Sequence, residues 1–126
     1  MTQEQKDLLL KDLCGRLTYG VKVKFGDSKP ALLTVIEQDE FGWQIGSEDE
    51  FGGMITIIDN VKPYLFPLSS MTREQEREWQ SLMVCDIYGI FYHTIESFDY
   101  LYKNHIDIRG LIPMGLAEDA TGLNIY

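Results

Sequence analysis

The two cysteines and two histidines are the side chains of this sequence most suited to chemistry. Cys85, followed by Asp86 and with His93 further on, has the residue types of a nucleophile, an orienting acid and a general base. No glycine-rich oxyanion loop and no local signature surround this thiol, and its neighbours Val84 and Ile87 are apolar. An apolar setting favours a buried, inert thiol. We therefore predict no catalytic residue, and a small hydrolase is the least favoured of the functions considered.

Metal binding would draw on the same residues. Cys85, His93 and His105 are separated by eight and twelve residues, a spacing that matches no familiar zinc motif, and a closed zinc site needs four ligands. The acidic run Glu48-Asp49-Glu50 lacks the ligand spacing of an EF-hand loop and is typical of a solvated hairpin tip. The sequence therefore predicts neither a metal nor another cofactor.

Arg109 and a set of aromatic side chains are better candidates for binding. Arg109 could bind a carboxylate or phosphate through both ends of its guanidinium group, or it could pair with Asp107 or Asp99 and tie the last turns to the body. Seven Tyr, six Phe and two Trp exceed what a small core holds, so some rings must reach the surface, where they are common in protein interfaces. The predicted binding residues are Trp43, Tyr100, Tyr102, Asp107 and Arg109.

The charge is strongly negative and unevenly spread. The 126 residues include 20 Asp and Glu and 11 Lys and Arg, which gives a net charge of −9. Such a surface repels phosphate backbones, so nucleic-acid binding is disfavoured. The first 30 residues are the exception, with six basic and four acidic side chains. An alternative nucleic-acid face could use the basic residues there, namely Arg16, Lys22, Lys24 and Lys29.

The cysteines and the opening residues also bear on location. Cys14 and Cys85 form no Cys-x-x-Cys motif and no disulfide framework, which predicts free thiols in a reducing compartment. The first residues are polar, unlike a secretory signal, and no apolar run approaches the ~18 residues of a membrane-spanning helix. We therefore expect a cytoplasmic protein with no membrane segment.

In the first half of the chain, the spacing of the apolar residues changes from that of a helix to that of β-strands. Residues 2–14 predict a helix, because Thr2 and Gln5 have capping-box spacing and leucines recur at helical intervals up to Gly15, which suits a helix end. Apolar side chains then recur at every second position, which predicts short strands joined by turns, near residues 21–25, 31–37, 41–46, 54–58 and 64–68. Pro63 and Pro67 would keep the last of these at an edge of the sheet.

The second half is predicted to be mainly helical. Thr72 with Gln75 repeats the capping-box spacing, and Thr94 can cap a further helix. Residues 85–92 fit either a strand or a buried loop. Residues 107–120, interrupted by glycines and a proline, fit short helical turns.

These elements predict an α+β fold in one domain, residues 1–126. Residues 1–70 would form an N-terminal helix and a small bent antiparallel sheet, or an SH3-like or Sm-like barrel, of about five strands. Residues 71–126 would supply two or three helices packed on it. This architecture carries no function by itself.

Three stretches resemble a known group of proteins. Leu8–Val23 (LLLKDLCGRLTYGVKV), Val61–Glu74 (VKPYLFPLSSMTRE) and Phe98–Ala117 (FDYLYKNHIDIRGLIPMGLA) are together similar to small proteins encoded by phages and mobile elements of gut Bacteroidales. The resemblance covers most of the chain in the same order, apart from residues 38–53 and 84–93. That group has no established activity, cofactor or catalytic residue, so the resemblance implies a mobile-element setting and no mechanism.

The leading hypothesis is therefore a non-catalytic protein-interaction module of a phage or mobile element. It would bind a partner protein, or a second copy of itself, through an acidic surface that contains aromatic residues. The alternative is a nucleic-acid-binding small barrel that uses the basic strand face around Lys22 and Lys24.

Overall fold

The computed structural model describes residues 1–49 and 52–126. Helix α1 (Gln3–Arg16) begins after Thr2, whose hydroxyl accepts a hydrogen bond from the Gln5 backbone N–H, while the Gln5 side chain accepts one from the Thr2 N–H. These two bonds satisfy backbone donors that the start of a helix leaves free. The capping box predicted here is confirmed.

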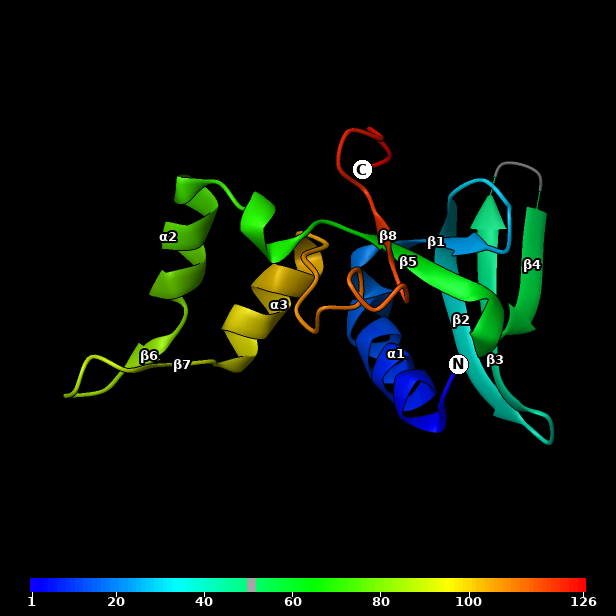
Figure 1. Ribbon diagram of the computed structural model, residues 1–126, viewed down its shortest axis with the longest axis horizontal. Helices are drawn as coiled ribbons and strands as arrows, with labels where there is room; N and C mark the ends of the chain where they lie inside the picture. The colour runs from blue at the N-terminus through cyan, green and yellow to red at the C-terminus, as the bar shows by residue number, and fades with distance from the viewer. Residues whose placement is uncertain (50–51) are drawn as a thin grey trace.

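An open sheet of six strands forms the other main part of the fold (Figure 1). Its strands lie in the order β4-β3-β2-β1-β5-β8, and all neighbours are antiparallel except β5 and β8. Their bounds are β1 (Lys22–Phe25), β2 (Ala31–Asp39), β3 (Gly42–Asp49), β4 (Gly52–Ile57), β5 (Val61–Leu65) and β8 (Glu118–Asp119).

The predicted α+β class is confirmed, but the SH3-like or Sm-like barrel does not form. Closure would require β4 to pair with β8, and in the described part of the chain these two strands remain opposite edges of one sheet. Strand β8 has only two residues, too few for the ladder that closes a barrel. It also comes from the segment 107–120, which was predicted to form helical turns.

Helix α1 covers one face of the sheet, and the main core lies between them (Figure 1). Leu9 and Leu13 of α1 are fully buried against Val23 and Ile45 of the sheet. The two-residue period predicted for β1 holds, since Val23 and Phe25 are buried and Lys22 and Lys24 are partly exposed. Leu111 and Leu116, from the turns after residue 107, complete this core.

Three strands differ from their predicted positions. Strands β3 and β4 extend into the acidic segment predicted as a loop, where Glu48 pairs with Gly53; Glu50 lies outside the described residues. Strand β5 lies between β1 and β8, so the edge position predicted from its proline is wrong. Pro63 is tolerated because β8 pairs only with Tyr64 and Leu65.

The remaining elements form a second, smaller assembly beside the sheet. They are α2 (Arg73–Ser81), β6 (Val84–Cys85), β7 (Phe91–Tyr92) and α3 (Ile95–Lys103), and short 3₁₀ turns lie at 17–19, 58–60 and 68–70. The predicted caps at Thr72 and Thr94 are confirmed. Met71, Leu101 and Ile106 form a separate small core here. None of the helices described is long and apolar enough to cross a membrane.

Gly15 lies inside α1, not at its end as predicted, and it faces the Tyr102 ring of α3. A Cβ atom on Gly15 would lie 2.5 Å from Tyr102 Cζ. Alanine gains about 1 kcal/mol of helix propensity, whereas displacing a packed ring costs roughly 1–3 kcal/mol.

We therefore expect Gly15→Ala to lower the free energy of unfolding by about 1 kcal/mol, as measured by urea denaturation. Tyr102→Leu in the same background should remove the steric part of this loss. A Gly15→Ala variant that is more stable than the parent would show that the Tyr102 ring can move aside without a loss of packing energy.

Candidate protein-binding surface

Residues Val84–Tyr92 form a two-stranded hairpin that projects away from the sheet, at the far left of Figure 1. Val84 pairs with Tyr92, and Cys85 pairs with Phe91. The sequence left a strand and a buried loop as alternatives for this segment. The structure has strands here, and all but Asp86 of these residues are exposed. We call Val84–Tyr92 the exposed hairpin.

The turn of the exposed hairpin is held by one carboxylate. Asp86 Oδ1 accepts hydrogen bonds from the backbone N–H of Tyr88 at 2.8 Å and of Ile90 at 3.0 Å, and Asp86 Oδ2 accepts one from the Tyr92 hydroxyl at 3.1 Å. These bonds, led by the one from Ile90, hold the pKa of Asp86 below its ordinary value. Gly89 supplies the left-handed backbone that the turn requires, with φ 79°. The tip is therefore pre-shaped without a partner.

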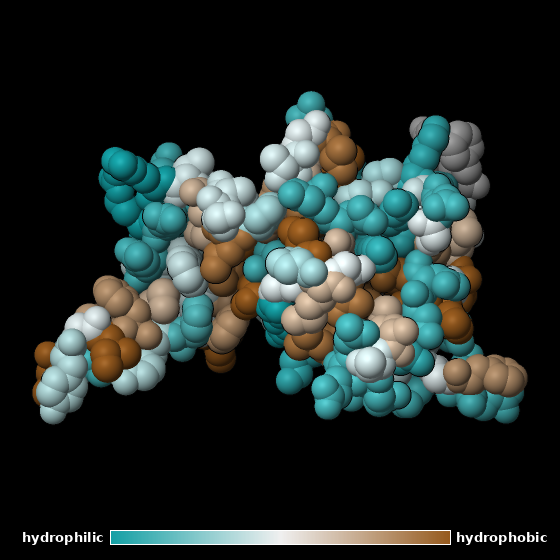
Figure 2. All heavy atoms as spheres, viewed as in Figure 1, coloured by the Kyte–Doolittle hydropathy of each residue, from teal (hydrophilic) through white to brown (hydrophobic). Residues whose placement is uncertain are grey.

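The side chains that the hairpin presents are apolar. Ile87 is 91% exposed and Tyr88 is 82% exposed. Figure 2 shows apolar residues at this extremity of the molecule. Soluble monomers rarely expose contiguous apolar groups of this kind outside interaction sites. Five further apolar residues on or beside the hairpin are also exposed: Val84, Ile90, Phe91, Tyr92 and Ile95.

The surroundings of the hairpin are acidic. Residues 72–103 contain six acidic and three basic side chains. Glu96 lies in the first turn of α3, directly after the hairpin, and Glu74 and Glu76 lie in the first turn of α2. The apolar tip is therefore carried by an assembly of net negative charge.

The predicted aromatic residues lie elsewhere and hold elements together. Tyr100 donates a hydrogen bond to Glu78 at 2.8 Å and so joins α3 to α2. Its pKa is raised to about 12, first by burial and then by Glu78. Tyr102 accepts a hydrogen bond from Arg109 at 2.9 Å. Trp43 is partly buried and packs against the main core. None of these three rings lies on the exposed hairpin.

Arg109 and Asp107 also have structural partners, and these differ from the predicted ones. Arg109 binds Asp12 of α1 at 2.8 Å, rather than Asp107 or Asp99. Asp107 accepts hydrogen bonds from the backbone N–H groups of Leu111 and Ile112, which fixes the turns that follow. The predicted link between the turns after residue 107 and the rest of the fold therefore exists, but Arg109 makes it to Asp12 of α1, far away in sequence.

Arg16 is not available to the predicted nucleic-acid face. Its side chain is fully buried, its Nε lies 2.7 Å from Asp12 Oδ2, and its Nη2 also donates to the Ile106 carbonyl. A phosphate backbone cannot reach a group enclosed in this way. The proposed basic face is therefore reduced to lysines.

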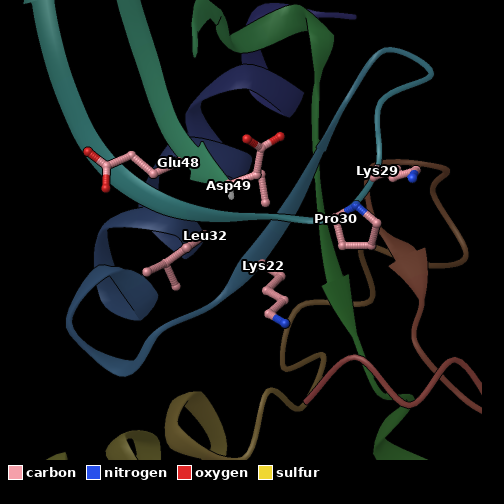
Figure 3. Close-up of a pocket in the computed structure, with 7 residues that line it drawn as sticks. Lys22, Lys29, Pro30, Leu32, Glu48 and Asp49 are labelled. Carbon is pink, nitrogen blue, oxygen red and sulfur yellow. The ribbon is translucent and has the colours of Figure 1, made fainter. Parts of the chain in front are cut away.

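Those lysines do not converge on a common point. Lys22 and Lys29 line a pocket of about 260 Å³, where Figure 3 shows them extending in different directions, with Glu48 and Asp49 at the end of β3 beside them. Lys24 pairs with Glu118 at 3.6 Å. A phosphate placed here would meet carboxylates as well as ammonium groups, so this geometry disfavours nucleic acid.

The three candidate metal or catalytic residues lie apart. His93 and His105 flank opposite ends of α3, a nine-residue helix about 13 Å long. Cys85 is exposed and bonds to the Asp86 carbonyl, whereas His93 Nδ1 contacts the Ser97 hydroxyl at 3.3 Å. Within residues 1–49 and 52–126, no three His, Cys, Asp or Glu side chains are grouped so that they could hold a metal ion.

No family model, curated protein or solved structure matches this chain. The similarity to phage and mobile-element proteins therefore stays a prediction from the sequence. The most distinctive feature of the molecular surface is the exposed hairpin.

Proposed function

We propose that this chain is a non-catalytic protein-interaction module whose exposed hairpin inserts into an apolar cleft of a partner protein. The observation that carries the proposal is the nearly complete exposure of Ile87 and Tyr88 at a tip that Asp86 holds in shape. An apolar tip fixed by its own hydrogen bonds has no evident use within the monomer. A mobile element is the setting that the sequence resemblance suggests.

Burial of this tip would supply useful binding energy. Transferring a side chain such as Ile87 from water into an apolar cleft contributes about 1.5–3 kcal/mol, and tyrosines are frequent hot spots of interfaces. Because Asp86 already fixes the turn, binding would lose less conformational entropy than ordering a free loop would. The acidic assembly around the hairpin favours a cleft with a basic rim.

The double variant Ile87→Ser/Tyr88→Ser tests the proposal. We expect it to lower partner recovery in affinity capture, quantified by mass spectrometry, by at least tenfold, since the two side chains supply more than the ~1.4 kcal/mol that a tenfold change requires. Because both side chains are exposed, the midpoint of thermal unfolding should not change.

Phe41→Ser is the matched control, because Phe41 is an 81% exposed aromatic residue in the turn that joins β2 and β3. It should leave capture unchanged. Sedimentation of the purified chain measures its oligomeric state. A dimer would identify a second copy as the partner, and a monomer would indicate a different protein. Capture that is unaffected by the double variant, or lost equally with Phe41→Ser, would refute the role of the exposed hairpin.

A further inference from the structure

A groove of about 490 Å³ lies away from the exposed hairpin, between the second assembly and the C-terminal segment. Phe66 and Tyr126 contribute aromatic rings to it, with centroids 5.9 Å apart. Tyr126 is held firmly, because its hydroxyl donates to the Tyr64 carbonyl at 2.7 Å and accepts from the Lys22 N–H at 2.8 Å. One side of the groove is thus a fixed aromatic wall.

Several of the other lining residues are polar, and Ile106 is apolar. Lys103 is exposed at the end of α3 and forms no ion pair within the described residues. Gln75, Asn104 and Thr121 add amide and hydroxyl groups. No Asp or Glu among the described residues lines this groove, although the chain has a net charge of −9. Lys103 therefore gives the described lining a positive charge within a chain that is negative overall.

The floor of the groove holds a half-buried histidine. His105 stacks on Tyr126 with ring centroids 3.7 Å apart, and its pKa is lowered to about 4, first by burial and then by the charge of Arg16. Arg16 Nη1 and His105 Nδ1 are both buried without a hydrogen-bond partner in the described structure. Because Arg16 is paired with Asp12 and His105 is neutral at pH 7, the exposed Lys103 supplies the positive charge of this groove.

The backbone of the floor is also unusual. His105 has φ 60°, a left-handed conformation that a residue other than glycine seldom adopts. It is held there because the His105 carbonyl accepts from the Phe66 N–H and the Phe66 carbonyl accepts from the Asp107 N–H, each at 2.8 Å. The same conformation ends α3, because the Ile106 N–H donates to the Leu101 carbonyl and the His105 N–H to the Tyr102 carbonyl, the usual bonds of a left-handed residue after a helix.

We propose that this groove binds a small organic anion that carries a planar ring, with the ring against Phe66 and Tyr126 and the anionic group beside Lys103. The aromatic wall accounts for the ring, and the Lys103 ammonium, which forms no ion pair within the described residues, accounts for the anion. This site is separate from the exposed hairpin, and its occupation does not depend on a protein partner.

Amide NMR titration of the full chain tests the site with two ring-bearing probes, AMP for a phosphate and indole-3-acetate for a carboxylate. Adenosine and inorganic phosphate serve as the separate halves of AMP. We expect saturable shifts of the Lys103, Asn104 and Thr121 amides with at least one of the two anions. If AMP binds, adenosine and inorganic phosphate should each bind at least tenfold more weakly than AMP.

Lys103→Gln should weaken that binding by about tenfold, whereas Lys29→Gln, which removes a lysine beside a different pocket, should not change it. Which probe binds decides between a phosphate and a carboxylate ligand. Absence of saturable shifts with both anions at concentrations of about 10 mM, where a millimolar Kd would be evident, overturns the proposal. Adenosine binding as tightly as AMP, or Lys103→Gln binding as tightly as the parent, would also overturn it.

Discussion

Replacing Asp12 with alanine is expected to lower the free energy of unfolding by about 3–5 kcal/mol, the largest effect of any single substitution considered. Asp12 is fully buried and is the carboxylate that both Arg16 and Arg109 contact, at 2.7 Å and 2.8 Å. Without it, a fully buried guanidinium and a largely buried one would share the interior with no counter-ion.

Urea denaturation followed by circular dichroism measures this loss, with Asp7→Ala as the control. Asp7 lies on the same helix but is exposed, so its removal should cost less than about 0.5 kcal/mol. The double variant Asp12→Leu/Arg16→Met should lower the free energy of unfolding less than Asp12→Ala alone does, because it removes the buried Arg16 charge together with its partner. A loss below about 1 kcal/mol in Asp12→Ala would mean that water reaches the arginines.

Acidification from pH 6.5 to pH 4 should destabilise the fold through His105. The pKa of His105 is lowered from 6.5 to about 4 in the folded protein, by burial and by Arg16. The unfolded chain therefore binds a proton in this range that the folded chain does not, so stability is full above pH 6.5 and declines as the pH falls towards 4. We expect a loss on the order of 2 kcal/mol, less than complete burial would give, because the ring is only partly buried.

The comparison with His105→Asn isolates this contribution. Asparagine tolerates the left-handed backbone at this position but does not titrate. Arg16 and Tyr126, which face the ring, and nearby Lys103 are the same in both proteins, as are all the Asp and Glu residues. The slope of unfolding free energy against pH between 4 and 6.5 should be shallower in the variant. Equal slopes would assign the acid sensitivity to other groups.

Local patterns predicted the parts of this fold that depend on local interactions. The caps at Thr2, Thr72 and Thr94 follow from hydrogen bonds within four residues, and the alternation in β1 follows from the geometry of a strand with one buried face. The α+β class followed from the order of these elements. Whether the sheet closes depends on the pairing of β4 with β8, which lie more than 60 residues apart in the chain. No local pattern specifies such a pairing.

The candidate site was harder to predict for the same reason. Ile87 and Tyr88 have the composition of core residues, and their exposure follows from the way α2 and α3 carry the hairpin away from the sheet. Asp86 and Gly89 beside them are residue types common in turns, and this signal was not used in the prediction. Arg16 was placed on a basic face because the first 30 residues carry more basic than acidic side chains, but it is fully buried and bonds to Asp12 and to the Ile106 carbonyl. Burial of a charge is a property of the tertiary structure.

The position of Cys85 has a practical consequence. Its thiol is exposed on the hairpin, two residues from Ile87, so a thiol-specific dye has a natural attachment point next to the tip. Cys14 is also exposed, but partial burial raises the pKa of its thiol, which leaves less of its reactive thiolate at neutral pH. The chain thus carries its own spectroscopic handle where docking would change the polarity around a fluorophore.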